Sequence, residues 1–367
     1  MKRHKPNYLF PFLLVALFAI IAVFALKTKQ DETGKPTIEA TFKQAWTEAT
    51  PFNHPRRALA AVTYNNHLYV IGGIDASNHY VRTVEYTKIN LDGQLNAWQT
   101  GTDLNEGRFY LAAAAINGFL YAIGGAKGAL GEQNTPVATV EKAKINPDGS
   151  LGEWQIEQEL TTPRRGLTVN QHNSHLYALG GYNGVFLHSI EHTTVNHDGT
   201  LNEWQLSPLQ SEVDRYIHSS TISRDTLYLL AGHMKNSNTV SYGDVESSQL
   251  TATGALTPWR IENSRIVTPR FIASAFSLGD FIYIAAGHDG ARRLGSVEVA
   301  RIDATGRAGD WQEIAPLITP RSGTATATHN NRVYIVGGIS QNRVLNSVES
   351  AIQTIDGKLG NLATDIK

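Results

Sequence analysis

The sequence predicts an all-β protein, a six-bladed β-propeller that follows one N-terminal transmembrane helix. Three observations predict this architecture. One pattern of residues occurs six times at intervals of 50 to 56 residues. Each copy holds several short strand-like segments bounded by glycine turns, which is typical of propeller blades. A stretch of 19 uncharged, mostly apolar residues precedes the first copy.

The apolar stretch, residues 8–26, matches the ~20 residues that a helix needs to cross a bilayer. Lys2, Arg3 and Lys5 precede it, and the positive-inside rule then predicts a cytoplasmic N-terminus. A cleaved signal peptide is the alternative, although no polar stretch separates its candidate recognition positions, Val23 and Ala25, from the apolar run. We therefore expect a single-pass protein with a cytoplasmic segment (1–7), a signal anchor (8–26), a linker (27–42) and an extracytoplasmic propeller (43–367).

Composition excludes several classes of function. The chain has no cysteine, so disulfides, thiolate metal sites and cysteine nucleophiles are excluded. Beyond residue 30 the chain carries 27 Lys and Arg against 33 Asp and Glu, without a basic run, so nucleic acid is not an expected partner. No Asn-x-Ser/Thr acceptor is present, which favours a bacterial periplasm or cell surface over a eukaryotic secretory origin.

Each repeat is marked by the same residues at nearly fixed spacing. A tryptophan precedes an arginine by ten or eleven residues, and sixteen residues later a small pair closes an apolar strand, as in LYVIGG. A Val-Glu or Ile-Glu dipeptide follows, and eight residues beyond the glutamate stands a turn glycine. The tryptophans are Trp46, Trp98, Trp154, Trp204, Trp259 and Trp311; the arginines are Arg56, Arg108, Arg164, Arg215, Arg270 and Arg321.

This order predicts four antiparallel strands in each blade. The sixth repeat has Leu362 at the tryptophan position, whereas Trp46 lies upstream of the first arginine. We therefore expect the segment around Trp46 to complete the last blade, which closes the ring and leaves no open sheet edge.

The small pair, the Val-Glu strand and the single tryptophan of each repeat resemble the Kelch repeat, over residues 46–362. Ala231 and Ala286 replace the first glycine in two repeats, and both are small enough to preserve a close backbone approach. Some proteins of this kind are enzymes. Galactose-oxidase-like propellers need a cysteine-crosslinked tyrosine, so the absence of cysteine excludes a copper radical oxidase. The resemblance still permits a sugar-acid isomerase similar to the periplasmic sialic acid mutarotases.

Loop length indicates which face binds a ligand. The segment between the small pair and the Val-Glu strand varies from 9 to 15 residues, whereas the other intervals within the repeat are nearly constant. Loops on a rigid scaffold commonly carry recognition, so we expect binding on the face that holds this loop, on the side away from the membrane. The candidate binding residues are Arg57, Tyr110, Arg165, Tyr182, Tyr216, His218, His233, Phe271, His288, Asp289 and Arg292.

Two clusters have competing interpretations. The six repeated arginines and glutamates form either an anion-binding ring or one structural ion pair in each blade, and we favour the ion pairs because a ligand seldom needs six equivalent arginines. His233 and His288, with His218 and Asp289 nearby, form either a metal or acid–base cluster or ordinary polar surface. We favour polar surface because no metal-binding spacing is present. No metal or cofactor is expected.

These observations favour a non-catalytic binding or scaffolding propeller in the cell envelope, which recognises a protein segment or a glycan. The alternative is a carbohydrate-active isomerase or mutarotase acting on a sugar acid, for which Arg165, Tyr216, His218 and His233 are the candidate residues. A flat or apolar mouth favours binding, whereas a deep polar funnel with pKa-shifted groups favours catalysis.

Overall fold

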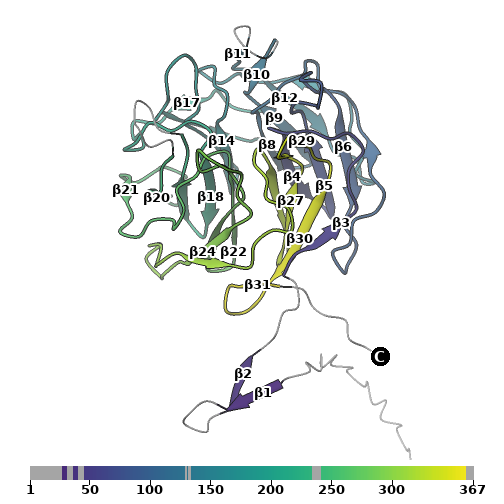
Figure 1. The fold of residues 1–367 in the computed structure, drawn as a ribbon. Coiled ribbons are helices and arrows are strands. Elements are labelled where there is room, and N and C mark those ends of the chain that lie inside the picture. Colours follow the sequence, from purple (N-terminus) through teal and green to yellow (C-terminus); the bar gives the residue numbers. More distant parts are fainter. Residues whose placement is uncertain are drawn as a thin grey trace, which may run out of the picture. The chain divides into compact units, whose positions relative to one another are not determined.

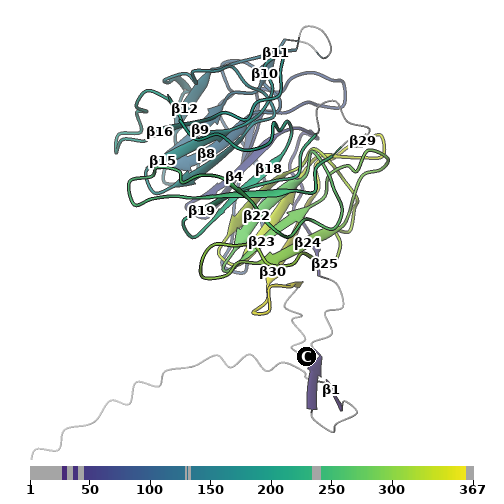
Figure 2. The ribbon, with the colours of Figure 1, turned by 90° about the vertical axis from the view of Figure 1, so that its left-hand side faces the viewer.

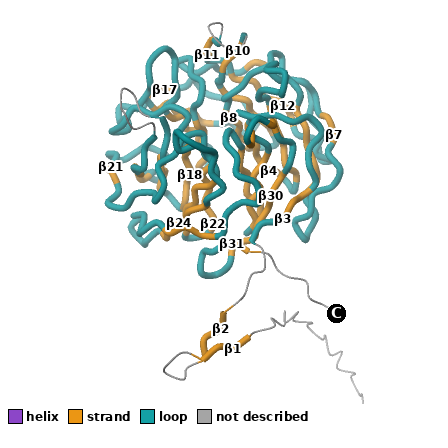
Figure 3. The backbone as a smooth tube through the Cα atoms, in the orientation of Figure 1, coloured by secondary structure: helices purple, strands orange, loops and turns teal. Residues whose placement is uncertain are grey.

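A computed structural model of the protein describes residues 27–30, 36–39, 45–128, 130, 134–233 and 241–360. The chain divides into two compact units, Met1–Lys43 and Gln44–Lys367. In the first unit, β1 (Lys27–Gln30) and β2 (Pro36–Glu39) pair as an antiparallel hairpin within the segment predicted as a linker. The described residues contain no helix that is long and apolar enough to span a membrane (Figure 3). The predicted transmembrane segment, residues 8–26, lies outside these residues.

The second unit consists of six antiparallel sheets around a central channel (Figures 1 and 2). Each innermost strand contacts the innermost strands of both neighbouring sheets, and the contact between β26 and β4 completes the circle. This arrangement confirms the predicted all-β, six-bladed propeller.

The four strands of a blade run from the channel to the outer edge. The innermost strands are β4 (Ala60–Tyr64), β8 (Ala112–Ile116), β14 (Thr168–His172), β18 (Ser219–Ser223), β22 (Ser274–Leu278) and β26 (Ala325–His329). The second strands are β5 (His67–Ile71), β9 (Phe119–Ile123), β15 (His175–Leu179), β19 (Thr226–Leu230), β23 (Phe281–Ala285) and β27 (Arg332–Val336). The third strands are β6 (Val84–Lys88), β12 (Val140–Lys144), β16 (Ile190–Thr194), β20 (Val245–Gln249), β24 (Val297–Arg301) and β30 (Val348–Gln353).

The outer strands are short. They are β7 (Gln99–Thr100), β13 (Gln155–Ile156), β17 (Gln205–Leu206), β21 (Arg260–Ile261), β25 (Gln312–Ile314) and β3 (Thr47–Ala49). Two hairpins decorate the loops after the second strands of blades 2 and 6, formed by β10 (Ala126–Lys127) with β11 (Thr135–Pro136) and by β28 (Ile339–Ser340) with β29 (Arg343–Val344).

The last blade contains strands from both ends of the propeller. β3 pairs antiparallel with β30, so a strand from the beginning of this unit forms the outer edge of blade 6. Trp46, which is 1% exposed, donates its indole N–H to the carbonyl of Ala315 in blade 5 at 3.1 Å. β31 (Leu359–Gly360) also pairs with β30, and Leu362 lies outside the described residues.

The small pair at the end of each second strand allows neighbouring blades to approach closely. Gly72 has a φ of 60°, and a Cβ at this position would lie only 2.7 Å from the carbonyl oxygen of Arg108 in the next blade. Glycine tolerates such a φ, which other residues adopt at a cost. Ala231 and Ala286 adopt φ values of 59° and 60°, so the same backbone conformation is kept where alanine replaces glycine.

A ring of tyrosine hydroxyl groups links each blade to the next. Each second strand carries one buried tyrosine, and its hydroxyl donates to the carbonyl of the turn glycine in the following blade at 2.7–2.9 Å. Burial raises the pKa of all six phenols, so they stay protonated as donors at neutral pH. The pairs are Tyr69–Gly149, Tyr121–Gly199, Tyr177–Gly254, Tyr228–Gly306, Tyr283–Gly357 and Tyr334–Gly93.

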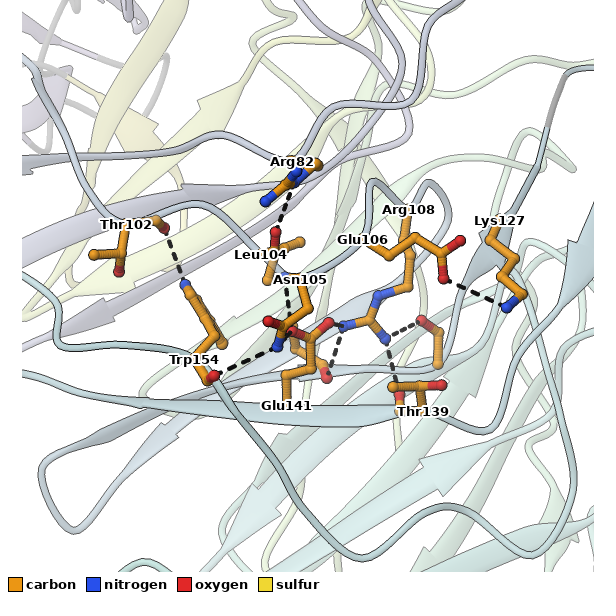
Figure 4. Close-up of polar contacts among 12 residues, drawn as sticks. Arg82, Thr102, Leu104, Asn105, Glu106, Arg108, Lys127, Thr139, Glu141 and Trp154 are labelled. Carbon is orange, nitrogen blue, oxygen red and sulfur yellow. Dashed lines mark hydrogen bonds and ion pairs between the residues drawn. The ribbon is translucent and has the colours of Figure 1, made fainter.

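Each blade also contains one buried arginine–glutamate ion pair, as blade 2 illustrates (Figure 4). The Arg108 guanidinium contacts the Glu141 carboxylate at 2.6 Å and donates to the carbonyls of Gly124 and Thr139, at 2.9 and 2.8 Å. The prediction of one structural pair in each blade is confirmed, because both side chains are at most 1% exposed in all six. The other pairs are Arg56–Glu85, Arg164–Glu191, Arg215–Glu246, Arg270–Glu298 and Arg321–Glu349.

Candidate functional site

Two positions in each blade come together where the channel opens. One is the residue after the repeat arginine, and the other is the residue after the small pair. Their backbones pair with each other in every blade, so both side chains project from the same short ladder. The pairs, from blade 1 to blade 6, are Arg57–Ile74, Phe109–Ala126, Arg165–Tyr182, Tyr216–His233, Phe271–His288 and Ser322–Ile339.

A closed ring of six backbone hydrogen bonds encircles the channel next to these ladders. The ring residue is the second residue after each arginine, and it has a φ between 45° and 64°. Its N–H donates to the carbonyl of the equivalent residue in the preceding blade at 2.8–3.2 Å, and Ala58 closes the circle by donating to Gly323. We name this feature the mouth ring, formed by Ala58, Tyr110, Gly166, Ile217, Ile272 and Gly323.

Aromatic side chains form a continuous arc over the mouth ring, from blade 1 to blade 5. Neighbouring rings have centroid distances of 4.6–6.3 Å, which is the usual range of aromatic contacts. All except Phe109 are half-buried, so the arc presents an accessible apolar surface. We name this surface the aromatic arc, and its members are Tyr80, Phe109, Tyr110, Tyr182, Phe186, Tyr216, His233, Phe271 and His288.

Gly166 lets the arc cross blade 3. A Cβ at Gly166 would lie 2.5 Å from a ring carbon of Tyr216, so the missing side chain is what lets Tyr216 reach Tyr110. The Arg165 guanidinium lies over both the Tyr182 and Tyr216 rings, at 4.9 and 5.6 Å. Such cation–π contacts hold the guanidinium in place without neutralising its charge.

The structure gathers eight of the eleven predicted site residues at the mouth. Arg57, Tyr110, Arg165, Tyr182, Tyr216, His233, Phe271 and His288 occupy the ladders, the mouth ring or the aromatic arc. Tyr80 and Phe186 also belong to the arc but were not among the predicted residues. Both lie in the loop of variable length, where the repeat does not determine which side chain turns inward.

Asp289 and Arg292 lie in the loop of blade 5 and pair with each other. The Asp289 carboxylate accepts hydrogen bonds from the backbone N–H groups of Ala291 and Arg292, and it lies 3.6 Å from the Arg292 guanidinium. Burial raises the pKa of Asp289, but these contacts outweigh it and hold that pKa below its usual value. The Arg292 side chain is 82% exposed, whereas the adjacent Arg293, which was not predicted, lines a cavity at the mouth.

His218 belongs to the channel wall. It is 5% exposed, its Nε2 lies 3.0 Å from the Thr168 hydroxyl, and its buried Nδ1 has no hydrogen-bond partner. Burial, reinforced by the positive charges of Arg215 and Arg164, lowers the pKa of His218 to about 3. An imidazole with so low a pKa is a weak general base at neutral pH.

Replacing His218 with leucine, the residue at the equivalent position of blades 1 to 3, is expected to reduce acid sensitivity. An unfolded histidine takes up a proton below pH ~6.5, whereas His218 in the folded protein does so only near pH 3. The wild-type free energy of unfolding therefore falls by about 1.4 kcal/mol for each pH unit below 6.5, or about 2 kcal/mol at pH 5. Burial also lowers the pKa of His175, His192 and His329, which all three proteins share. Urea unfolding between pH 7 and 5 should therefore show a loss that is about 2 kcal/mol smaller in His218→Leu than in wild type or in a His197→Leu control at the surface. Parallel pH profiles for all three proteins would contradict the assignment.

The mouth offers stacking surfaces, phenol donors and guanidinium groups. Within the part of the chain that the structure describes, no group of three or more His, Asp or Glu side chains is placed to hold a metal ion. Burial raises the pKa of Tyr110 and Tyr216, so both phenols remain protonated donors. This chemistry suits a ligand that combines a flat apolar surface with hydrogen-bond acceptors.

The Kelch motif family model matches residues 55–86 and 320–350. Both matches run from the repeat arginine strand to the Val-Glu strand, in blades 1 and 6. The chain is 26% identical to bovine (Bos taurus) Kelch-like protein 36 over 257 residues, which cover 68% of this chain and 39% of that protein. It is 35% identical to mouse (Mus musculus) Kelch-like protein 9 over 98 residues, which cover 27% of this chain and 15% of that protein.

The solved structure of YjhT superposes with a TM-score of 0.64 at 15% identity, covering 85% of this chain and 98% of that one. This likeness concerns the fold. The matches to the two curated relatives span well under half the length of each. The chain is therefore a six-bladed β-propeller with one strand order in every blade, and its first and last blades carry Kelch motifs.

Proposed function

We propose that this protein is a non-catalytic binding module that recognises a protein segment or a glycan through the aromatic arc. The observation that carries the proposal is the continuity of the arc, which joins side chains from five blades into one half-buried surface. Exposed aromatic side chains that cluster around a depression contribute a large share of binding energy in known interfaces.

The setting of this function is also a proposal, and it rests on the sequence. We infer that residues 8–26 anchor the chain in a membrane with the propeller outside the cytoplasm, in a bacterial periplasm or at a cell surface. β30 begins on the mouth side and runs away from the mouth. β3 pairs antiparallel with β30, so β3 runs toward the mouth. This direction supports an anchor on the side opposite the mouth, so that the aromatic arc faces away from the membrane.

An isomerase or mutarotase has less support. Such an enzyme needs an acid–base residue at the mouth with a pKa near neutrality. His218 lies in the channel wall with a pKa of about 3, and Asp289 is held as an anion by its own loop. These two groups are therefore poorly suited to proton transfer, and the continuous aromatic arc favours the binding proposal.

The binding function is tested with the double variant Tyr182→Ala/Tyr216→Ala. Each aromatic side chain at the centre of an interface contributes about 1–2 kcal/mol or more, so the pair is expected to weaken binding by at least about tenfold. Peptides selected from a random library on the full chain, and a panel of envelope glycans, serve as probes in calorimetric titrations.

A matched control replaces two apolar side chains of outer strands, Ile156→Ala/Leu206→Ala. These side chains are 59% and 52% exposed and lie away from the channel. Their loss should leave affinity unchanged. Equal weakening by both double variants would show that the arc is not the binding surface.

A further inference from the structure

The aromatic arc is interrupted at blade 6. The two ladder positions of this blade hold Ser322 and Ile339, whereas blades 2 to 5 present at least one aromatic ring at these positions. A cavity of about 290 Å³ lies at this gap. We name it the blade-6 notch, and it is lined by Arg57, Ala58, Tyr110, Ile272, His288, Arg293, Ser322, Gly323 and Ile339.

Two arginines from opposite sides of the gap contribute to the notch, Arg57 from blade 1 and Arg293 from blade 5. The Nε atoms of both are buried and have no hydrogen-bond partner. Arg57 donates from another nitrogen to the Asn78 side chain at 3.1 Å, which is a neutral acceptor. Within the described residues, neither arginine forms an ion pair, and the lining of the notch includes no carboxylate.

This lack of neutralisation distinguishes Arg57 and Arg293 from the six repeat arginines and from Arg292. All six repeat arginines contact a glutamate, and Arg292, the direct neighbour of Arg293, contacts Asp289. Arg57 and Arg293 are half-buried, and their buried Nε atoms lack the acceptor that a buried donor normally meets. The positive charge of the notch is therefore available to a ligand.

His288 adds a neutral donor to the notch. Its Nδ1 accepts a hydrogen bond from the backbone N–H of Gly290 at 2.9 Å, so the proton of the neutral ring is on Nε2. Burial, reinforced by Arg293, lowers the pKa of His288, which keeps the ring neutral at pH 7. The notch thus combines two guanidinium groups with an imidazole N–H donor.

We propose that the blade-6 notch binds a carboxylate group of the ligand while the aromatic arc holds its neighbouring apolar part. A carboxylate presents two coplanar oxygens, which match the fork of a guanidinium group. The carboxylate belongs either to an acidic side chain of a protein segment or to a sugar acid, and the chemistry in the notch is the same. This inference rests on the proposed binding function and adds the charge that the ligand must carry.

The experiment compares Arg293→Gln with Arg292→Gln in calorimetric titrations of the full chain. These adjacent arginines have the same charge, but only Arg293 lines the notch. One set of probes consists of acidic peptides selected from a random library on the full chain, each paired with a copy in which Asp and Glu are replaced by Asn and Gln. The other set is glucuronate paired with glucose, and N-acetylneuraminate paired with its uncharged methyl ester.

For at least one set of probes we expect the carboxylate form to bind at least about tenfold more tightly than its neutral copy. Arg293→Gln should abolish this preference, whereas Arg292→Gln should change affinity by less than about twofold. A preference confined to the peptides identifies a protein segment, and one confined to the sugars identifies a sugar acid. Thermal melting of each variant checks that the fold is intact, and Arg57→Gln provides a second variant from the other side of the notch.

Two results would overturn the inference. One is equal affinity for charged and neutral probes, and the other is an equal effect of the two arginine substitutions. If the neutral probes bind as tightly as the charged ones, and Tyr182→Ala/Tyr216→Ala weakens their binding, the proposed binding function stands without the carboxylate site. If neither set of probes binds in a way that depends on the aromatic arc, the binding function itself is overturned.

Discussion

Replacing Glu141 with alanine is expected to lower the free energy of unfolding by about 3–5 kcal/mol, because the substitution leaves a buried charge without its partner. The Glu141 carboxylate is 1% exposed and contacts the Arg108 guanidinium at 2.6 Å (Figure 4). It also accepts hydrogen bonds from the backbone and side-chain nitrogens of Asn105, at 2.9 and 2.6 Å. Burial lowers the pKa of Arg108, and the nearby carboxylate opposes this shift, so losing Glu141 removes the group that stabilises the buried cation.

A control for this substitution lies a few residues away. Glu106 contacts Lys127 at 3.5 Å, and their side chains are 55% and 47% exposed (Figure 4). Exposed pairs of this kind contribute about 0–1 kcal/mol, so Glu106→Ala should have a small effect. Urea unfolding followed by tryptophan fluorescence measures both. Similar losses for the two variants would show that the buried pair has no special structural role.

Replacing Trp46 with alanine is expected to lower the free energy of unfolding by about 3–5 kcal/mol, the usual cost of truncating a buried tryptophan. Trp46 packs in a cluster with residues of blades 5 and 6, such as Leu317 and Val333. Its indole N–H also donates to Ala315. Since β3 is joined to blade 6 by pairing and packing alone, this truncation should additionally release residues 45–50 from the sheet.

Trp204→Ala is the matched control, because Trp204 is 4% exposed and donates its indole N–H to Gln158 at 3.1 Å within the ring. Its loss should cost a similar free energy, but the strands on both sides stay connected to their blade. Hydrogen exchange by mass spectrometry should therefore show fast exchange at residues 45–50 in Trp46→Ala only. Unchanged protection of this segment would mean that backbone pairing alone holds the ring closed.

The architecture could be predicted because the residues that build it recur at fixed spacing. The repeat arginine, the small pair, the Val-Glu dipeptide and the turn glycine each occupy one place in a blade, so six copies define six sheets. The arginine–glutamate pairs followed from the same recurrence. The tyrosine ring was harder to foresee, because each hydroxyl meets a carbonyl in the next blade, 74 to 80 residues further along in five cases.

The candidate site was only partly predictable, for a physical reason. Residues at the ladder positions have fixed spacing from the repeat arginine, and most of the predicted site residues at the mouth come from there. Tyr80, Phe186 and Arg293 lie in loops whose length differs between blades, so no periodicity indicates their direction. Arg292 and Arg293 illustrate this limit, because two adjacent arginines differ in burial only through the local path of the loop.

The two rings of hydrogen bonds run in opposite directions around the channel. In the mouth ring each blade donates to the blade before it, whereas each tyrosine donates to the blade after it. A terminal repeat of a linear array frays by giving up one interface. In this closed circle, any blade that detaches must give up two interfaces at once. Partial unfolding of a single blade is thereby suppressed, and the loops around the mouth are carried on a scaffold that opens cooperatively or not at all.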